Sequence, residues 1–386
     1  MKLPSKLGKR LEKRKKDNSF RRLPGKSQLI DFYSNDYLGL AVSENICRKA
    51  AALLEKENLA GNGATGSRLL SGNNKLYNLA EDLIASFHAS EAALVFNSGY
   101  DANIGFFSAV PQRGDLVLYD ELVHASIRDG ISMSPAKAYK FRHNDHLHII
   151  ELLKRYDSHS EDAAVFIVTE SVFSMDGDKA RLKDLAQLCK ENNCYLIVDE
   201  AHATGVFGQN GNGLVQELQL EEIIFARIYT FGKALGCHGA AVLGSRNLKD
   251  YLVNFARSFI YTTGLPPHSL ATILAVYKEL ESASNVGKEI ARLKTNIEHF
   301  KKCTLSNGLN DYFIESHSAI HSCVIPGNER VKFIAKELAA EGFEVKPILS
   351  PTVPQGKERL RFCIHSYNSF SEVEQVLTHL AIFIKQ

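Results

Sequence analysis

The sequence has no apolar run that is long enough to cross a lipid bilayer. Its longest apolar stretches, residues 163–168 and 195–198, are far shorter than the roughly 20 residues that a membrane-spanning helix needs. It also has no internal repeat, and 23% of its residues are charged against 45% that are hydrophobic. This composition excludes disordered, collagen-like and coiled-coil chains, and it predicts a globular, soluble protein without a membrane span.

Cysteine is also scarce. The seven cysteines stand singly, their number is odd, and no C-x-x-C spacing occurs. No apolar signal peptide is recognisable in the sequence. We therefore expect a reducing compartment and a cytoplasmic location.

Positive charge is concentrated in one segment. The whole chain has 46 basic and 44 acidic side chains, but residues 1–22 hold ten Lys or Arg and two acids. Leu3, Leu7 and Leu11 recur there at helical spacing, which predicts a short amphipathic helix docked on the body of the protein; a solvated run of charge is the alternative. Nucleic-acid binding would need a basic face with aromatic platforms, and we do not expect it.

Short apolar runs and helical stretches alternate along most of the chain. The helical stretches include residues 146–155 and 182–192. The apolar runs are residues 92–96, 116–119, 165–169, 195–198, 227–230 and 240–243. Because these runs are continuously apolar, they indicate strands of a sheet that is covered on both faces. The sequence therefore predicts an α/β fold with a doubly wound, mostly parallel sheet, preceded by a helix over residues 44–57.

The pattern changes after Pro266 and Pro267. A long helical stretch, residues 269–301, is followed by strand-like segments at 322–325 and 359–364, which a helix over 331–341 separates. We therefore predict three parts: a basic arm with a first segment (1–43), a large domain (44–268) and a smaller α+β C-terminal domain (269–386).

Two motifs resemble known sites without meeting their requirements. Residues 61–66 read G-x-G-x-x-G, but a helix precedes them, whereas a dinucleotide-binding loop follows a strand; a Gly-rich active-site loop is the better interpretation. His143, His146 and His148 match no common zinc spacing, and Asn144 or Asp145 is well placed to cap the next helix. We expect no metal site.

The informative cluster lies at the carboxyl ends of two predicted strands. Asp199 and His202 follow one strand, and Lys233 follows the next, so the three side chains can converge on one crevice. Pyridoxal phosphate (PLP) needs a lysine that forms a Schiff base with it, a carboxylate that pairs with its pyridine nitrogen, and a nearby imidazole. The alternative is that Asp199 and His202 only cap the following helix.

Four segments of the sequence resemble the α-oxoamine synthases. The resemblance runs from about residue 30 to the C-terminus and implies the type I aminotransferase fold, PLP as cofactor, and the joining of an amino acid to an acyl thioester with loss of carbon dioxide. The segments are Asn35-Asp36-Tyr37-Leu38-Gly39-Leu40, Gly66-Ser67-Arg68-Leu69-Leu70-Ser71-Gly72, Asp199-Glu200-Ala201-His202-Ala203-Thr204-Gly205 and Thr230-Phe231-Gly232-Lys233.

The resemblance also implies roles around the cofactor ring. Lys233 would carry PLP covalently, and Asp199 would pair with its pyridine nitrogen. His124 would stack on the ring, while His202 and Ser174 would lie near the phenolic oxygen of PLP. Lys233, Asp199, His124 and His202 are the predicted catalytic residues.

The same resemblance implies sites for the phosphate and for the substrates. Ser98, Gly99, Tyr100 and Thr230 would bind the phosphate, as a helix N-terminus favours. Thr262 or Thr263 would reach the phosphate of a partner subunit, which implies a homodimer with shared active sites. The predicted substrate-binding residues are Asn35, Arg361, Ser71, Arg21 and Arg22; Arg361 would grip the amino-acid carboxylate by a bidentate fork.

Tyr77 departs from the pattern of the family, and one segment near the C-terminus indicates which member of the family this chain resembles most. Relatives commonly have histidine where this chain has Tyr77, which we interpret as a variation at the edge of the pocket. The segment 347–354, with Gly356 and Arg361, looks most like the family member of the biotin pathway, which condenses alanine with a pimeloyl thioester. The alternatives are members that use glycine or serine, an ordinary aminotransferase and a catalytically dead homologue.

Overall fold

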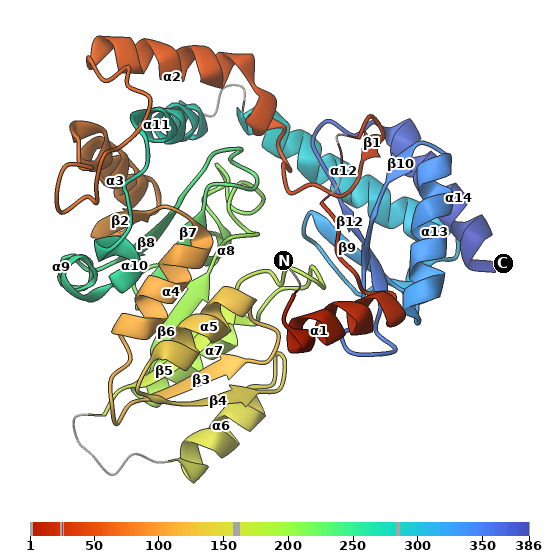
Figure 1. Cartoon of the computed structure of the whole chain (residues 1–386), viewed down its shortest axis with the longest axis horizontal. Coiled ribbons are helices and arrows are strands. Elements are labelled where there is room, and N and C mark those ends of the chain that lie inside the picture. The colour runs from red at the N-terminus through yellow and green to blue at the C-terminus, as the bar shows by residue number, and fades with distance from the viewer. Residues whose placement is uncertain (1–2, 24, 26, 157–162, 283–285, 386) are drawn as a thin grey trace. The chain divides into compact units, whose positions relative to one another are not determined.

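The computed structural model describes residues 3–23, 25, 27–156, 163–282 and 286–385 (Figure 1). Contacts within the chain divide it into two compact units. We call Asn35–Ser174 with Lys179–Arg292 the central unit, and Met1–Ser34, Met175–Asp178 and Leu293–Gln386 the terminal unit. The three predicted domains divide the sequence differently, and their boundaries stay a prediction.

A seven-stranded sheet forms the core of the central unit. Its order is β2-β8-β7-β6-β5-β3-β4; β8 runs antiparallel to both of its neighbours, and the other pairs are parallel. The strands are β2 (Ala92–Phe96), β3 (Leu116–Asp120), β4 (Lys137–Phe141), β5 (Val165–Glu170), β6 (Tyr195–Asp199), β7 (Ala226–Thr230) and β8 (Ala240–Gly244). All six predicted strands are confirmed.

The sheet is buried on both faces, as the continuous apolar runs predict. On β6, Ile197 packs into a cluster with Phe106 of α4 and Ile127 of α5. Leu196 and Val198 point to the opposite face, because successive side chains of a strand alternate, and they are equally buried. The predicted α/β fold with a mostly parallel sheet is therefore confirmed.

The sequence did not predict β4, the edge strand beside β3. Lys137 and Lys140 of this strand are exposed, and Phe141 is its one buried residue. Lysines on an edge strand discourage pairing with other chains, and they also hide the strand from a search for apolar runs.

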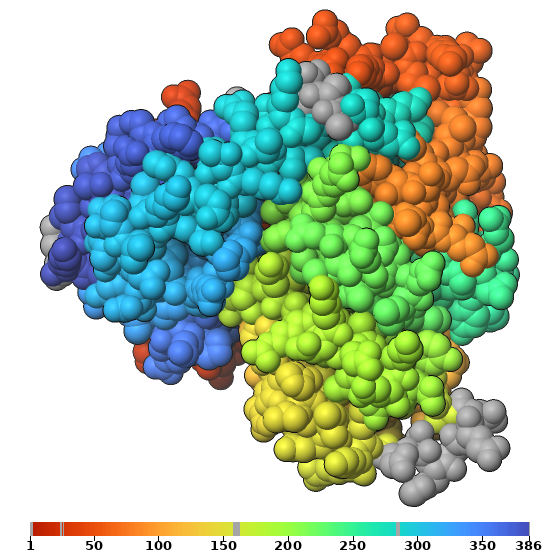
Figure 2. All heavy atoms as spheres, turned by 180° about the vertical axis from the view of Figure 1, so that it is seen from behind, coloured from red at the N-terminus to blue at the C-terminus, as the bar shows by residue number. Residues whose placement is uncertain are grey.

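Helices of the central unit join distant parts of the chain. Helix α2 packs against α11, and the two lie side by side in Figures 1 and 2. The helices are α2 (Glu44–Lys56), α3 (Lys75–Phe87), α4 (Gly99–Ala109), α5 (Ala125–Met133), α6 (His146–Arg155), α7 (Leu182–Glu191), α8 (Leu214–Glu217), α9 (Arg246–Phe255), α10 (Arg257–Ile260) and α11 (Pro267–Ser282), with a 3-10 turn, η1 (Leu40–Val42). Among the described residues, no helix is both long enough and apolar enough to cross a membrane.

The two rejected motifs have local structural explanations. The G-x-G-x-x-G segment follows helix α2 and not a strand, as expected. Asp145 is the N-cap of α6, where its side chain accepts a hydrogen bond from the His148 backbone. His143 instead contacts the buried Asp120, with 3.1 Å between its Nδ1 and the carboxylate.

The terminal unit combines both ends of the chain. Its antiparallel sheet has the order β11-β12-β9, and a parallel pair, β1 with β10, joins the first strand of the chain to a late one. The strands are β1 (Ile30–Asp31), β9 (Ile320–Val324), β10 (Phe343–Glu344), β11 (Lys346–Ile348) and β12 (Arg359–Cys363). The helices are α1 (Ser5–Lys16), α12 (Val286–Ser306), which belongs to this unit from Leu293 on, α13 (Asn328–Ala340) and α14 (Phe370–Lys385), with a 3-10 turn, η2 (Asn310–Tyr312).

The predicted basic helix is present as α1. Its leucines stay exposed, so its apolar stripe is not packed as docking on the body would require. Contacts with α13 come from the residues just after α1: Lys332 donates hydrogen bonds to Asn18, and Asn328 donates one to the Asp17 carbonyl. Where one helix was expected over 269–301, the structure has α11 and α12; residues 283–285 lie outside the described residues.

Candidate active site

Four predicted residues meet at the carboxyl ends of parallel strands in the central unit. Asp199 ends β6, His202 follows it, Lys233 follows β7 and His124 follows β3 as the N-cap of α5. Lys233 Nζ lies 2.8 Å from His202 Nε2. Strand order explains the convergence, because β3, β5, β6 and β7 are consecutive in the sheet and run parallel.

Tyr37 fixes the orientation of His202. The fully buried Tyr37 hydroxyl lies 2.8 Å from His202 Nδ1 and donates a hydrogen bond to Asn35 Oδ1 at 3.2 Å. Because its proton goes to Asn35, the Tyr37 oxygen accepts from Nδ1–H, which leaves the lone pair on Nε2. His202 can therefore accept a hydrogen bond or a proton from Lys233. Tyr37 stands in the segment Asn35–Leu40, but nothing in the sequence alone predicts this role for it.

Asp199 is a buried carboxylate held on both oxygens. Its Oδ2 accepts from Asn103 Nδ2 at 3.0 Å, and its Oδ1 accepts from the Ala201 backbone at 2.9 Å. Asn103 also donates to Ser126 Oγ at 3.0 Å, and Ser126 Oγ lies 2.7 Å from His124 Nδ1. A hydrogen-bonded chain thus links Asp199 to His124 through two residues that the sequence analysis missed.

Glu170 is a third residue that the sequence did not single out. It is the buried last residue of β5, and it accepts a hydrogen bond from the His124 backbone at 2.5 Å. Burial, with the nearby Asp199 carboxylate, raises the pKa of Glu170 to about 8. Its place at the end of an apolar strand is the same signal that pointed to Asp199.

His124 is exposed, in contrast to Asp199 beside it. Partial desolvation lowers the pKa of His124 below its ordinary value; Asp199 opposes this shift and Lys233 adds to it. The imidazole therefore favours its neutral form and has a ring surface that a flat ligand can cover.

The predicted phosphate site surrounds the beginning of α4. Ser98 caps this helix by accepting a hydrogen bond from the Asp101 backbone. A Cβ on Gly99 would lie 2.6 Å from Thr230 Oγ1, so only glycine lets the helix N-terminus approach the Thr230 hydroxyl this closely. Backbone N–H groups and a hydroxyl at a helix N-terminus are suited to a phosphate. Tyr100 is exposed, and its hydroxyl donates to Asp129.

The predicted threonines and Ser71 lie near this helix end. Asn97, just before Ser98, donates hydrogen bonds to Thr262 Oγ1 at 3.0 Å and to the Thr263 carbonyl at 2.7 Å. Ser71 is exposed in a neighbouring loop, whose Gly66 carbonyl accepts from the Gly264 backbone. Ser174 is buried and its backbone hydrogen-bonds Glu170.

Three predicted substrate residues belong to the terminal unit. Arg361 lies on β12, opposite Ser322 of β9, and it is buried. Arg21 and Arg22 are exposed beyond the end of α1. The roles of Arg361, Arg21 and Arg22 in binding substrate stay predictions.

Tyr77 is a buried residue of the central unit. It is 1% exposed on α3, and its hydroxyl accepts a hydrogen bond from the Leu265 backbone at 2.6 Å. The Arg68 guanidinium lies 3.7 Å from the centre of its ring. Whether Tyr77 affects the pocket stays a prediction.

The residues of the central unit fit PLP. The basic amine of Lys233, next to a proton acceptor, suits the aldehyde of that cofactor, and the buried carboxylate of Asp199 suits its ring nitrogen. The exposed imidazole of His124 suits the ring face, and the helix N-terminus at Gly99 suits the phosphate. The chemistry of the donors and the space kept open at Gly99 carry this conclusion.

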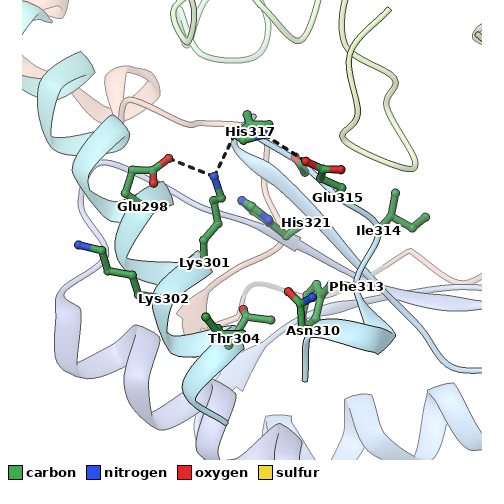
Figure 3. Close-up of a pocket in the computed structure, with 12 residues that line it drawn as sticks. Glu298, Lys301, Lys302, Thr304, Asn310, Phe313, Ile314, Glu315, His317 and His321 are labelled. Carbon is green, nitrogen blue, oxygen red and sulfur yellow. Dashed lines mark hydrogen bonds and ion pairs between the residues drawn. The ribbon is translucent and has the colours of Figure 1, made fainter. Parts of the chain in front are cut away.

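A pocket of about 480 Å³ lies elsewhere, in the terminal unit (Figure 3). Lys301, Glu298 and His317 interact at its mouth, and His321 lines it with a buried Nε2 that has no hydrogen-bond partner. Burial lowers the pKa of His321 to about 3. None of the predicted site residues lines this pocket.

Comparisons with known proteins agree with this assignment. The family model for aminotransferase class I and II matches residues 27–380. An 8-amino-7-oxononanoate synthase from Emericella nidulans is 40% identical, over 97% of this chain and 94% of that protein. A putative 8-amino-7-oxononanoate synthase from Bacillus cereus is 39% identical, over 94% of this chain and 89% of that protein.

Solved structures are similar over almost the whole chain. The crystal structure of 8-amino-7-oxononanoate synthase from Francisella tularensis is 31% identical, with a TM-score of 0.77 over 93% of this chain and 99% of that chain. A serine palmitoyltransferase structure with the PLP internal aldimine is 27% identical, with a TM-score of 0.89 over 99% of this chain and 98% of that chain. The fold is that of the type I PLP-dependent transferases. The chain belongs to the aminotransferase class I and II family, and within it to the α-oxoamine synthases, which are PLP-dependent acyltransferases.

Proposed function

We propose that this enzyme condenses L-alanine with a pimeloyl thioester, on CoA or on a carrier protein, to give 8-amino-7-oxononanoate, carbon dioxide and the free thiol, a step of biotin biosynthesis. The observation that carries this choice is the 40% identity to the Emericella nidulans 8-amino-7-oxononanoate synthase over 97% of the chain. The hydrogen-bonded pair Lys233 and His202, with the buried Asp199, supplies residues suited to this chemistry.

PLP, when bound, supplies an electron sink for the carbanion that forms at the α-carbon of the amino acid. Asp199 holds positive charge at the ring nitrogen, and Asn103 and the Ala201 backbone keep its two oxygens in place. The beginning of α4 and the Thr230 hydroxyl hold the phosphate. His124 would cover one face of the ring.

Lys233 Nζ removes the α-proton of alanine, because it is the basic amine of the site. His202 Nε2 accepts a hydrogen bond from Nζ at 2.8 Å and can share that proton, while Tyr37 keeps Nε2 as the accepting nitrogen. The α-carbon then attacks the thioester carbonyl, the thiol leaves, and the β-keto acid loses carbon dioxide. A proton returned to the α-carbon completes the product.

The remaining predicted residues bind substrates in this proposal. Asn35 and Arg361 hold the carboxylate of alanine, with Ser71 nearby, and Arg21 or Arg22 meets the distant carboxylate of the pimeloyl group. The proposal also includes a cytoplasmic homodimer with shared active sites. In this dimer, Thr262 or Thr263 reaches the phosphate bound by the partner subunit.

The competing proposal is an α-oxoamine synthase that uses glycine or serine with another acyl-CoA. It is supported by the TM-score of 0.89 to serine palmitoyltransferase, which exceeds the 0.77 to the Francisella tularensis enzyme. Against it, the sequence identity to that palmitoyltransferase is 27%. An extra methyl group on the amino acid discriminates by only about 1 to 3 kcal/mol, so some turnover of glycine is compatible with the alanine proposal.

A substrate panel tests the proposal. Alanine, glycine and serine are each combined with pimeloyl, succinyl, acetyl and palmitoyl thioesters, and thiol release is followed, with Lys233→Ala as the blank. We expect alanine with the pimeloyl thioester to react fastest. Faster release from glycine with succinyl-CoA, or from serine with palmitoyl-CoA, would overturn the substrate assignment. Pyruvate formed from alanine without an acyl thioester would indicate an aminotransferase instead.

A further inference from the structure

Three potential metal ligands meet between two helices of the terminal unit. His299 and Cys303 lie one turn apart on α12, and Glu374 lies on α14. In the part of the chain that the structure describes, this is the only group of three or more His, Cys, Asp or Glu side chains whose ligand atoms all lie within 4.8 Å of one another. None of the three belongs to the predicted active site.

The two distances from His299 Nε2 to the other ligand atoms are close to the edges of a zinc tetrahedron. His299 Nε2 lies 3.1 Å from Glu374 Oε1 and 3.4 Å from Cys303 Sγ. Tetrahedral Zn²⁺, with bonds of about 2.0 Å to nitrogen and oxygen and about 2.3 Å to sulfur, separates N from O by about 3.3 Å and N from S by about 3.6 Å. Both observed distances are within a few tenths of an ångström of these values.

The single ring nitrogen His299 Nε2 cannot hydrogen-bond to both of its neighbours at once. If Nε2 of His299 carries a proton, it donates to the Glu374 carboxylate and has no lone pair for the Cys303 thiol. If Nε2 is unprotonated, it accepts from the thiol and offers nothing to Glu374. A cation between the three atoms interacts favourably with all of them at once.

The ring of His299 is also held in place. It stacks on Phe370 of α14, with 4.2 Å between ring centres and 24° between ring planes. Cys303 is buried, His299 is half-buried and Glu374 is exposed, so the group is anchored on one side and open to solvent on the other. This arrangement allows an ion to enter while two of the ligands are already oriented.

We infer that His299 Nε2, Cys303 Sγ and a Glu374 oxygen form a zinc site, with water as the fourth ligand. Mixed nitrogen, sulfur and oxygen donors in tetrahedral order favour Zn²⁺ over Mg²⁺ or Ca²⁺, which prefer oxygen alone. On binding, the Cys303 thiol releases its proton to solvent and the sulfur binds as thiolate. The ion joins α12 to α14 and stabilises the terminal unit.

Cobalt is the probe for the first test. The untagged holoenzyme is treated with chelator, desalted and titrated with Co²⁺, which gives intense d–d bands in a tetrahedral site and a charge-transfer band when thiolate is bound. We expect one equivalent of Co²⁺ with both signals, and displacement by Zn²⁺. Failure to bind, or binding without the thiolate band, would overturn the site.

Variants of two of the proposed ligands give the second test. Cys303→Ser should abolish the charge-transfer band, and Glu374→Gln should weaken Co²⁺ binding at least tenfold. Cys47→Ser and Glu315→Gln are matched controls, because Cys47 is an exposed free cysteine and Glu315 pairs with His317 elsewhere. Zn²⁺ should raise the melting temperature of the parent and of both controls, but not that of Cys303→Ser. Equal binding by Cys303→Ser and the parent contradicts the inference.

Discussion

Tyr37 contributes one hydroxyl to the central unit, and that hydroxyl determines which nitrogen of His202 carries the proton. In Tyr37→Phe the ring remains but the oxygen is lost, so the contact of His202 Nδ1 with this hydroxyl is lost and no longer favours Nε2 as the acceptor for Lys233. We expect kcat to fall about tenfold, equivalent to about 1.4 kcal/mol, with a smaller change in KM.

Steady-state kinetics with PLP content measured in parallel check this prediction. Tyr251→Phe is the matched control, because its hydroxyl donates to the Ala109 carbonyl, away from the network. An unchanged kcat in Tyr37→Phe, or an equal loss in Tyr251→Phe, would show that the Tyr37 hydroxyl does not act through His202.

Glu170 makes the stability of the protein depend on pH. Burial raises the pKa of Glu170 from 4.5 to about 8, so the folded protein keeps a proton here that the unfolded chain releases between these values. The folded state binds more protons in that window, and stability therefore falls as pH rises from 4.5 to 8. Glu170→Gln imitates the protonated acid and should remove this slope.

Melting temperatures of the holoenzyme between pH 5 and 8 measure the effect. We expect Glu170→Gln to gain several degrees over the parent as pH rises. Glu217→Gln is the control, since Glu217 accepts a hydrogen bond from the Gly208 backbone outside the network. Parallel profiles for parent and Glu170→Gln would mean that Glu170 does not hold its proton in the fold.

At the scale of the element, the beginning of α4 depends on Gly99, which has no side chain. In Gly99→Ala the new Cβ meets Thr230 Oγ1 at 2.6 Å, so the helix end or the hydroxyl must move. We expect PLP affinity to fall about tenfold, or about 1.4 kcal/mol, with the fold retained. Gly8→Ala, in open space on α1, should leave the affinity unchanged.

PLP titration by absorbance measures this loss. The double variant Gly99→Ala with Thr230→Ala removes the collision but also the hydroxyl, so it should not regain parental affinity. Full recovery in the double variant would show that Thr230 only occupies space and gives the phosphate nothing.

Strands and helices that have a recognisable pattern of residues along the chain could be predicted from the sequence. Strands such as β6, buried on both faces, appear as apolar runs, and the polar residue at the end of each run marks the site, as with Asp199. The edge strand β4 lacks such a run because Lys137 and Lys140 face solvent. Asn103 could not be found, because its contact with Asp199 depends on how α4 packs across the sheet.

At the scale of the whole molecule, the proposed homodimer with shared active sites predicts complementation between inactive variants. We expect two variants to be nearly inactive: the single variant Lys233→Ala, and the double variant that combines Thr262→Val with Thr263→Val. If Lys233 and the threonines of one site come from different subunits, mixed dimers contain one intact site, because a twofold dimer has two equivalent sites. An equal mixture, unfolded and refolded together, should then regain about a quarter of the parental activity. No regain over the separate variants would place both sets of residues in the same subunit's site.

The pairing of β1 with β10 has a consequence for biosynthesis. Ile30 leaves the ribosome long before its partner Phe343 is made. At 5 to 20 residues per second, the segment must wait about 15 to 60 s for its strand partner. The seven-stranded sheet ends at Gly244, so it can form during that interval while the first strand has no partner. The terminal unit is therefore completed late in translation, with the earliest part of the chain among the last to fold.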